Sequence, residues 1–156
     1  MPMKILILED DTRRRRAMAD CLSDRFWQYE LVFFSNAADA KAYLQDHLDQ
    51  VLLLSLDHDL ELLPDGKGRF IDPGTGRDVV DFLMDTTPSF PVVLHSTNYA
   101  AVLGMRDVLD NVGWNAIVVA PYDDLAWIHE AWFPAVRRAI VDAAQPVPGP
   151  ELRAND

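Results

Sequence analysis

The feature that most constrains the fold is a regular alternation of short aliphatic runs with longer helical patterns. The runs occupy residues 3–9, 29–35, 50–57, 91–96 and 115–121. Each run is too short for a buried helix and leads into polar or turn-forming residues, which predicts a buried strand. Apolar residues recur at helical spacing over 11–26, 35–48, 76–86, 98–113 and 123–144, with Pro134 marking a break in the last segment. Because strands that alternate with helices form parallel sheets covered on both faces, the sequence predicts an α/β fold with a doubly wound, five-stranded parallel sheet in a three-layer sandwich.

The length and composition predict one folded domain. A chain of 156 residues with 49% hydrophobic residues can bury a core without disulfides, and its single cysteine, Cys21, has no internal partner. We expect the domain to span residues 1–144. The segment 145–156 is rich in proline and polar residues, which predicts a flexible tail.

The charge restricts the possible partners. A formal net charge of −11 argues against duplex DNA, because binding to duplexes needs a basic face. No apolar run approaches the ~20 residues needed to cross a bilayer, and acidic residues follow the first run at Glu9. We therefore expect a cytoplasmic protein without a membrane partner, in which a local cluster of basic residues can still hold a small anion.

Ionisable side chains gather where the predicted strands end. In doubly wound sheets, ligands bind at the carboxyl ends of the strands, so these residues are the first candidates for a site. The candidates are Glu9 and Asp10 after the first strand, Asp57, His58 and Asp59 after the third, and His95, Ser96 and Asn98 at the fourth. Carboxylates at neighbouring strand ends repel one another unless a cation lies between them.

Two explanations of these acids stay open. A divalent cation such as Mg²⁺ prefers oxygen ligands, and Glu9, Asp10 and Asp57 would supply them. The alternative needs no metal: the acids share a proton, or they pair with basic residues of the following loop and helix, namely Lys67, Arg69 or Arg77. His95 also has a purely structural interpretation, as a core histidine whose nitrogens are satisfied by neighbouring groups.

Four stretches of the sequence resemble the receiver domain of response regulators. "MKILILEDDTRRRRAMADCL" is similar to the receiver opening, and "VLLLSLD" ends at Asp57 in the position of the phosphoacceptor aspartate. "PVVLHS" places Ser96 at the receiver serine or threonine, and "NAIVVAPY" resembles the fifth strand. The resemblance covers residues 3–142. It implies a flavodoxin- or receiver-like fold, Mg²⁺ held by Glu9, Asp10 and Asp57, and phosphorylation of Asp57.

The sequence departs from that pattern where phosphate would bind. A receiver has a lysine before the proline that follows its fifth strand, whereas this chain has Ala120. Loss of that cation removes a charge-assisted contact to a phosphoryl group. The altered set, "LDHDL" together with "HSTN", resembles a receiver-related group assigned to the processing of cyclic phosphates at RNA or nucleotide termini.

This resemblance and the residue types suggest a phosphoesterase. Opening a cyclic phosphate needs a base and an acid, and histidine suits both roles because its ordinary pKa lies near neutrality. We predict His58 and His95 as this pair, with Asp57 or Asp59 orienting an imidazole. Residues predicted to bind the phosphorylated substrate, a small molecule or an RNA terminus, are Ser96, Asn98, Lys67, Arg69 and Arg77.

Two other functions remain as alternatives. The first is an atypical receiver that works as a signalling or binding module, either phosphorylated on Asp57 or independent of phosphorylation. The second is an adaptor that forms a homodimer through its last helices, where Trp127, Trp132 and Phe133 could make an apolar patch.

Overall fold

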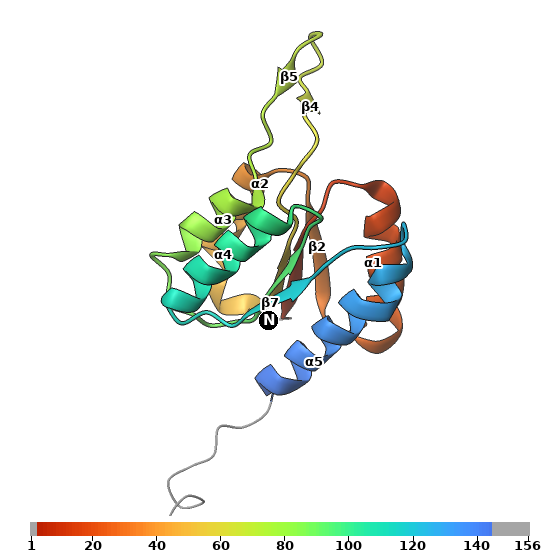
Figure 1. Ribbon diagram of the computed structural model, residues 1–156, viewed down its shortest axis with the longest axis vertical. Coiled ribbons are helices and arrows are strands. Elements are labelled where there is room, and N and C mark those ends of the chain that lie inside the picture. Colours follow the sequence, from red (N-terminus) through yellow and green to blue (C-terminus); the bar gives the residue numbers. More distant parts are fainter. Residues whose placement is uncertain (1–2, 145–156) are drawn as a thin grey trace, which may run out of the picture.

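A computed structural model describes residues 3–144, and its central element is a five-stranded parallel sheet (Figure 1). The strands are β1 (Lys4–Leu8), β2 (Glu30–Phe34), β3 (Val51–Leu56), β6 (Val92–His95) and β7 (Ala116–Val119). They lie in the order β2-β1-β3-β6-β7, and every neighbouring pair is parallel. The predicted fold class is confirmed. The predicted tail, 145–156, lies outside the described residues.

Helices cover both faces of the sheet, as predicted. They are α1 (Thr12–Arg25), α2 (Ala37–His47), α3 (Gly76–Leu83), α4 (Tyr99–Asn111) and α5 (Phe133–Ala144). Alternate residues of the strands lie on opposite faces of the sheet and pack into two separate hydrophobic cores. Ile5 and Ile7 of β1 pack with α1 and α5, whereas Leu6 and Leu8 pack with α2, α3 and α4. Figure 1 shows α1 and α5 on one side of the sheet and α3 and α4 on the other.

The last helix begins irregularly. A five-residue π-helical stretch, η2 (Ile128–Trp132), precedes α5, and the Phe133 N–H donates to the Ile128 carbonyl. Pro134 has no N–H to donate to a carbonyl one turn back, which explains why the helix changes at the predicted break. Trp127 and Trp132 are fully buried against the sheet. They are therefore core residues, and the proposed dimer through this region stays untested.

The segment after β3 differs in part from the predicted loop. It forms a hairpin of two short antiparallel strands, β4 (Leu63–Pro64) and β5 (Phe70–Ile71), which projects from the domain above the carboxyl end of the sheet (Figure 1). Its strands pair over only two residue positions, too few to give the periodicity on which a strand prediction rests. A short 3-10 turn, η1 (Leu48–Gln50), leads into β3. Within residues 3–144, no helix combines the length and apolar character needed to cross a membrane.

Candidate active site

Glu9, Asp57 and His95 converge at the carboxyl ends of β1, β3 and β6. One potential ligand atom from each residue lies within 4.8 Å of the others. Glu9 and His95 are fully buried and Asp57 is 5% exposed. Because these three strands are neighbours in the sheet, the topology itself brings the three side chains together. We call this group the acid–histidine cluster.

A buried chain of hydrogen bonds holds His95 through its Nδ1 atom. The Trp132 indole N–H donates to Ser55 Oγ at 3.0 Å, and the same hydroxyl lies 2.7 Å from His95 Nδ1. The His95 ring also stacks on Trp127, with centroids 5.9 Å apart. Sequence reasoning did not identify Ser55 as a site residue. The only signal for it was a hydroxyl in the middle of a buried aliphatic strand.

Two buried atoms of the cluster lack hydrogen-bond partners among the described residues. They are Glu9 Oε1 and His95 Nε2, which lie 3.3 Å apart. A buried polar atom without a partner is costly, so such atoms call for a physical explanation. If His95 Nδ1–H donates to Ser55, the Nε2 lone pair faces Glu9 and Asp57. One imidazole nitrogen and two carboxylates are a donor set that suits Zn²⁺ or Mn²⁺ better than Mg²⁺.

Arg14 of α1 covers this cluster. Its NH1 lies 3.5 Å from Glu9 Oε1 and 3.8 Å from Asp57 Oδ2. The guanidinium group is 5.6 Å from the centroid of the Trp127 ring, and the Arg14 side chain is 28% exposed. Asp11 places Arg14, because its carboxylate caps α1 by accepting from the Arg14 N–H at 2.9 Å.

The two carboxylates differ in proton affinity. Burial raises the pKa of Glu9, but contact with His95, the Asp11 N–H and the charge of Arg14 outweigh burial, so that the pKa lies below its ordinary value. Burial is also the main influence on Asp57. It raises the Asp57 pKa to about 6, aided by the charge of Glu9 and opposed chiefly by His95. One acid of the cluster is therefore firmly ionised at pH 7, and the other titrates close to neutrality.

His58 and Asp59 lie at the surface beside the cluster. The His58 backbone N–H donates to Asp57 Oδ1 at 2.7 Å, and His58 Nδ1 is 2.7 Å from Asp59 Oδ1. Asn98 caps α4 by accepting from the Ala101 N–H, and its amide donates to both Asp59 oxygens at 3.3 and 3.4 Å. The His58 side chain is 16% exposed, so of the two predicted catalytic histidines it is the one that solvent reaches.

Other predicted site residues lie farther from the cluster. The Asp10 carboxylate accepts from the Glu61 N–H at the base of the hairpin. Ser96 is buried, and its hydroxyl accepts from the Asn98 N–H at 3.1 Å. Arg77 pairs with Asp81 along α3. Lys67 and Arg69 lie in the exposed turn of the hairpin. The structure thus brings Glu9, Asp57 and His95 together, with His58, Asp59 and Asn98 beside them.

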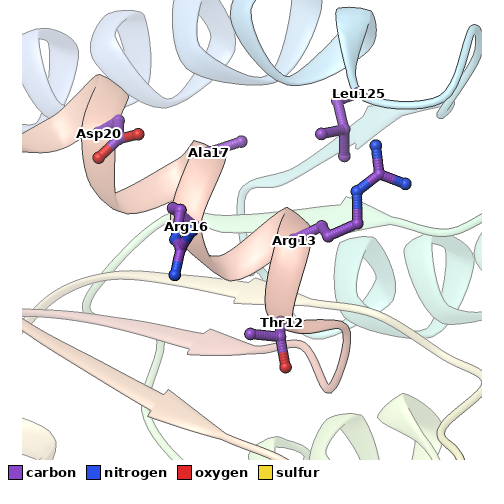
Figure 2. A pocket seen from close by; sticks show the side chains of 6 residues that line it. All are labelled: Thr12, Arg13, Arg16, Ala17, Asp20 and Leu125. Carbon is purple, nitrogen blue, oxygen red and sulfur yellow. The ribbon is translucent and has the colours of Figure 1, made fainter.

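A separate pocket of about 330 Å³ lies on the outer side of α1 (Figure 2). It is lined by Thr12, Arg13, Arg16, Ala17, Asp20 and Leu125. Arg13 forms an ion pair with Asp124 across this region at 2.8 Å. The pocket contains none of the cluster residues and is therefore separate from the candidate active site.

The raised pKa of Asp57 predicts that the ionised carboxylate destabilises the folded protein. Since the folded state holds this proton more tightly than the unfolded state, stability falls as the pH rises from about 4 to about 6. A rise in pKa from 3.8 to about 6 corresponds to at most about 3 kcal/mol. We therefore expect Asp57→Asn to be more stable than the wild type by up to about 3 kcal/mol at pH 7, and equally stable near pH 4.

Urea unfolding at pH 4, 5, 6 and 7, with a chelator present, measures this difference. Glu9→Gln is the matched control and should behave in the opposite sense. A carboxylate with a lowered pKa stabilises the folded state above its unfolded pKa, and this contribution is lost as the pH falls through the folded pKa. Equal stability of Asp57→Asn and the wild type at pH 7 would contradict the prediction.

Comparisons with known proteins agree with this architecture. The family model described as "Cyclic-phosphate processing Receiver domain" matches residues 5–111. The phosphorylated cyanobacterial phytochrome response regulator RcpA is 21% identical, with a TM-score of 0.69, over 93% of this chain and 98% of that one. A response regulator receiver domain from Rhodospirillum rubrum is 21% identical, with a TM-score of 0.60, over 94% of this chain and 97% of that one.

A third solved structure, the response regulator domain of Thermotoga maritima CheB, is 16% identical, with a TM-score of 0.62, over 95% of this chain and all of that one. At these identities the three structures show a shared fold. A search of curated proteins found no match. The family match covers more than half of the chain and includes the three strand ends that carry the cluster. The chain therefore belongs to the family of cyclic-phosphate processing receiver domains.

Proposed function

We propose that this protein is a metal-assisted phosphoesterase that acts on cyclic or terminal phosphates of nucleotides or RNA ends. The observation that carries the proposal is the acid–histidine cluster at the carboxyl edge of the sheet, in which the buried Glu9 Oε1 and His95 Nε2 have no hydrogen-bond partner among residues 3–144. A divalent ion held there by Glu9, Asp57 and His95 would supply positive charge for phosphoryl oxygens and acidify water. This assigns His95 to ion binding instead of the proton transfer predicted from sequence.

His58 is the proposed proton-transfer residue. In hydrolysis, a water oxygen bonds to phosphorus and releases a proton to the solvent, the bond from phosphorus to the leaving alcohol oxygen breaks, and that oxygen takes up a proton. The exposed part of the His58 ring can deliver this proton. Asp59 contacts Nδ1 and is itself fixed by Asn98, which leaves Nε2 as the nitrogen for the substrate. Asn98 and Asp59 thus orient the imidazole, and His58 alone transfers a proton.

The hairpin extends the proposed site toward larger substrates. Phe70 and Ile71 are 67% and 53% exposed, and the turn between β4 and β5 carries Lys67 and Arg69. Aromatic rings stack on bases, and basic side chains contact the phosphate backbone of single-stranded nucleic acids. An RNA terminus would be long enough to use these groups, whereas a mononucleotide bound at the cluster would not need them.

Turnover of 2′,3′-cyclic nucleotides tests the proposal directly. The protein is freed of metal and assayed alone and with Mg²⁺, Mn²⁺ or Zn²⁺. We expect hydrolysis with at least one ion, and its loss in Glu9→Gln, which keeps the shape of the side chain but removes its charge. Absence of turnover with all three ions, or full activity of Glu9→Gln, would contradict the proposal.

A second candidate function is signalling through phosphorylation of Asp57. It is favoured by the position of Asp57 at the end of β3 in a fold shared with receivers, among them the phosphorylated RcpA. Ala120 counts against it, because the position that carries a lysine in receivers then supplies no cation for a phosphoryl group. Treatment with acetyl phosphate followed by mass spectrometry decides between the two. Phosphate on Asp57 without turnover of cyclic nucleotides would favour the signalling function.

A further inference from the structure

The four consecutive arginines of α1 have four different environments. Arg13 pairs with Asp124, and Arg15 donates to the Glu9 backbone carbonyl and to Ser35 Oγ. Arg16 is exposed and lines the outer pocket of Figure 2. Only Arg14 reaches the carboxylates of the cluster. The four consecutive arginines therefore make separate contacts, and one of these contacts lies inside the candidate site.

Helix stability does not explain why an arginine occupies position 14. Thr12 begins α1, so Arg14 lies in its first turn, which contains no acidic residue. Positive charge there is opposed by the partial positive charge of a helix N-terminus. The contacts of Arg14 with Glu9, Asp57 and the Trp127 ring supply the compensating attraction. Arg14 is thus held by the cluster, against the preference of its own helix.

We propose that Arg14 is the resident cation of the acid–histidine cluster, and that a divalent ion competes with it for Glu9 and Asp57. Among residues 3–144, Arg14 is the only lysine or arginine that forms an ion pair with either carboxylate. Its side chain is the most exposed of the four that make up this ion-paired group. It is therefore the member that can move outward when an ion enters.

Electrostatics sets the direction of the effect. A guanidinium 3.5 to 3.8 Å from the carboxylate oxygens repels a second cation that binds to the same oxygens. Arg14 thereby keeps the two carboxylates compensated in the absence of an ion and weakens ion binding. The inference rests on the proposed function in taking this cluster as the ion site, but it does not depend on phosphoesterase activity.

Binding of Mn²⁺, measured by electron paramagnetic resonance and calorimetry, tests the competition. We expect Arg14→Gln to bind Mn²⁺ at least tenfold more tightly than the wild type. Arg14→Lys restores the charge and should bind within a few-fold of the wild type. Arg16→Gln is the matched control, since it removes the same charge from the same helix at a site outside the cluster. It should bind within about twofold of the wild type.

The wild-type protein provides a test that needs no variant. Titration with Mg²⁺ or Zn²⁺ should shift the side-chain Nε–H resonance of Arg14 in nuclear magnetic resonance spectra and leave that of Arg16 in place. Unchanged or weaker Mn²⁺ binding in Arg14→Gln, an equal gain in Arg16→Gln, or no ion binding by any variant would overturn the inference. Tighter binding in Arg14→Gln without any turnover would uphold the inference and contradict the proposed function alone.

Discussion

Replacing His58 by alanine is expected to lower kcat/KM for a 2′,3′-cyclic nucleotide by about 10²–10⁴-fold, the usual cost of removing a general acid or base. The loss should appear in kcat, because the proton moves in the transition state and not during binding. The side chain is partly exposed and its charged partner, Asp59, is 64% exposed. Its removal should therefore change the free energy of unfolding by less than about 1 kcal/mol.

His129→Ala is the matched control for this experiment. It removes a histidine from η2, where His129 Nδ1 lies 3.9 Å from Cys21 Sγ, on the α1–α5 side of the domain. Turnover should stay within about twofold of the wild type. Equal activity of His58→Ala and the wild type would exclude His58 as the proton donor.

Replacing Gly76 by alanine is expected to destabilise the protein by about 1–3 kcal/mol or more, the range found for overpacked interiors. A Cβ at this position would lie 2.0 Å from the Asp57 carbonyl oxygen and 3.0 Å from its carbon. The Gly76 N–H donates to the neighbouring His58 carbonyl at 3.0 Å, so the first residue of α3 rests directly on the end of β3. Relief of the clash must move either α3 or the backbone that carries Asp57 and His58.

Gly104→Ala distinguishes this clash from a general effect of glycine. Gly104 lies inside α4, and its Cβ would meet only the Arg77 NH1 at 3.7 Å, an ordinary contact. This change should stabilise the protein by about 0.5–1 kcal/mol, because alanine favours helices. Chemical denaturation of both variants measures the contrast. Comparable stability of Gly76→Ala and the wild type would mean that the backbone at Asp57 moves freely.

The sheet and the position of the site were predictable because they follow from patterns within single segments. Aliphatic runs of strand length identify β1, β3 and β6, and the topology of doubly wound sheets then places Glu9, Asp57 and His95 at one edge. The fold class and the family were both confirmed. The predicted strands extend beyond the observed ones by one residue at each end, and by two residues at the carboxyl end of β7.

The contacts between segments could not be predicted in the same way. Nothing in the "RRRR" run distinguishes Arg14 from its neighbours, because the choice depends on where α1 packs relative to β3. The burial of His95 depends on Trp127 and Trp132, which follow it by more than thirty residues. The metal role of Asp10 and the phosphate-binding roles of Lys67, Arg69 and Arg77 stay predictions, and none of these side chains joins the cluster.

The chain from Trp132 through Ser55 to His95 makes the last helix part of the electrostatics of the site. An indole N–H can only donate, so it always occupies one lone pair of the Ser55 hydroxyl. The hydroxyl can then either accept a hydrogen bond from a His95 Nδ1–H or donate one to an unprotonated Nδ1. The first arrangement presents a bare nitrogen to Glu9 and the second presents an N–H. A displacement of η2 that breaks this chain would alter which tautomer of His95 is favoured, so the packing at the start of the last helix and the ion affinity of the cluster are linked through the position of one proton on His95.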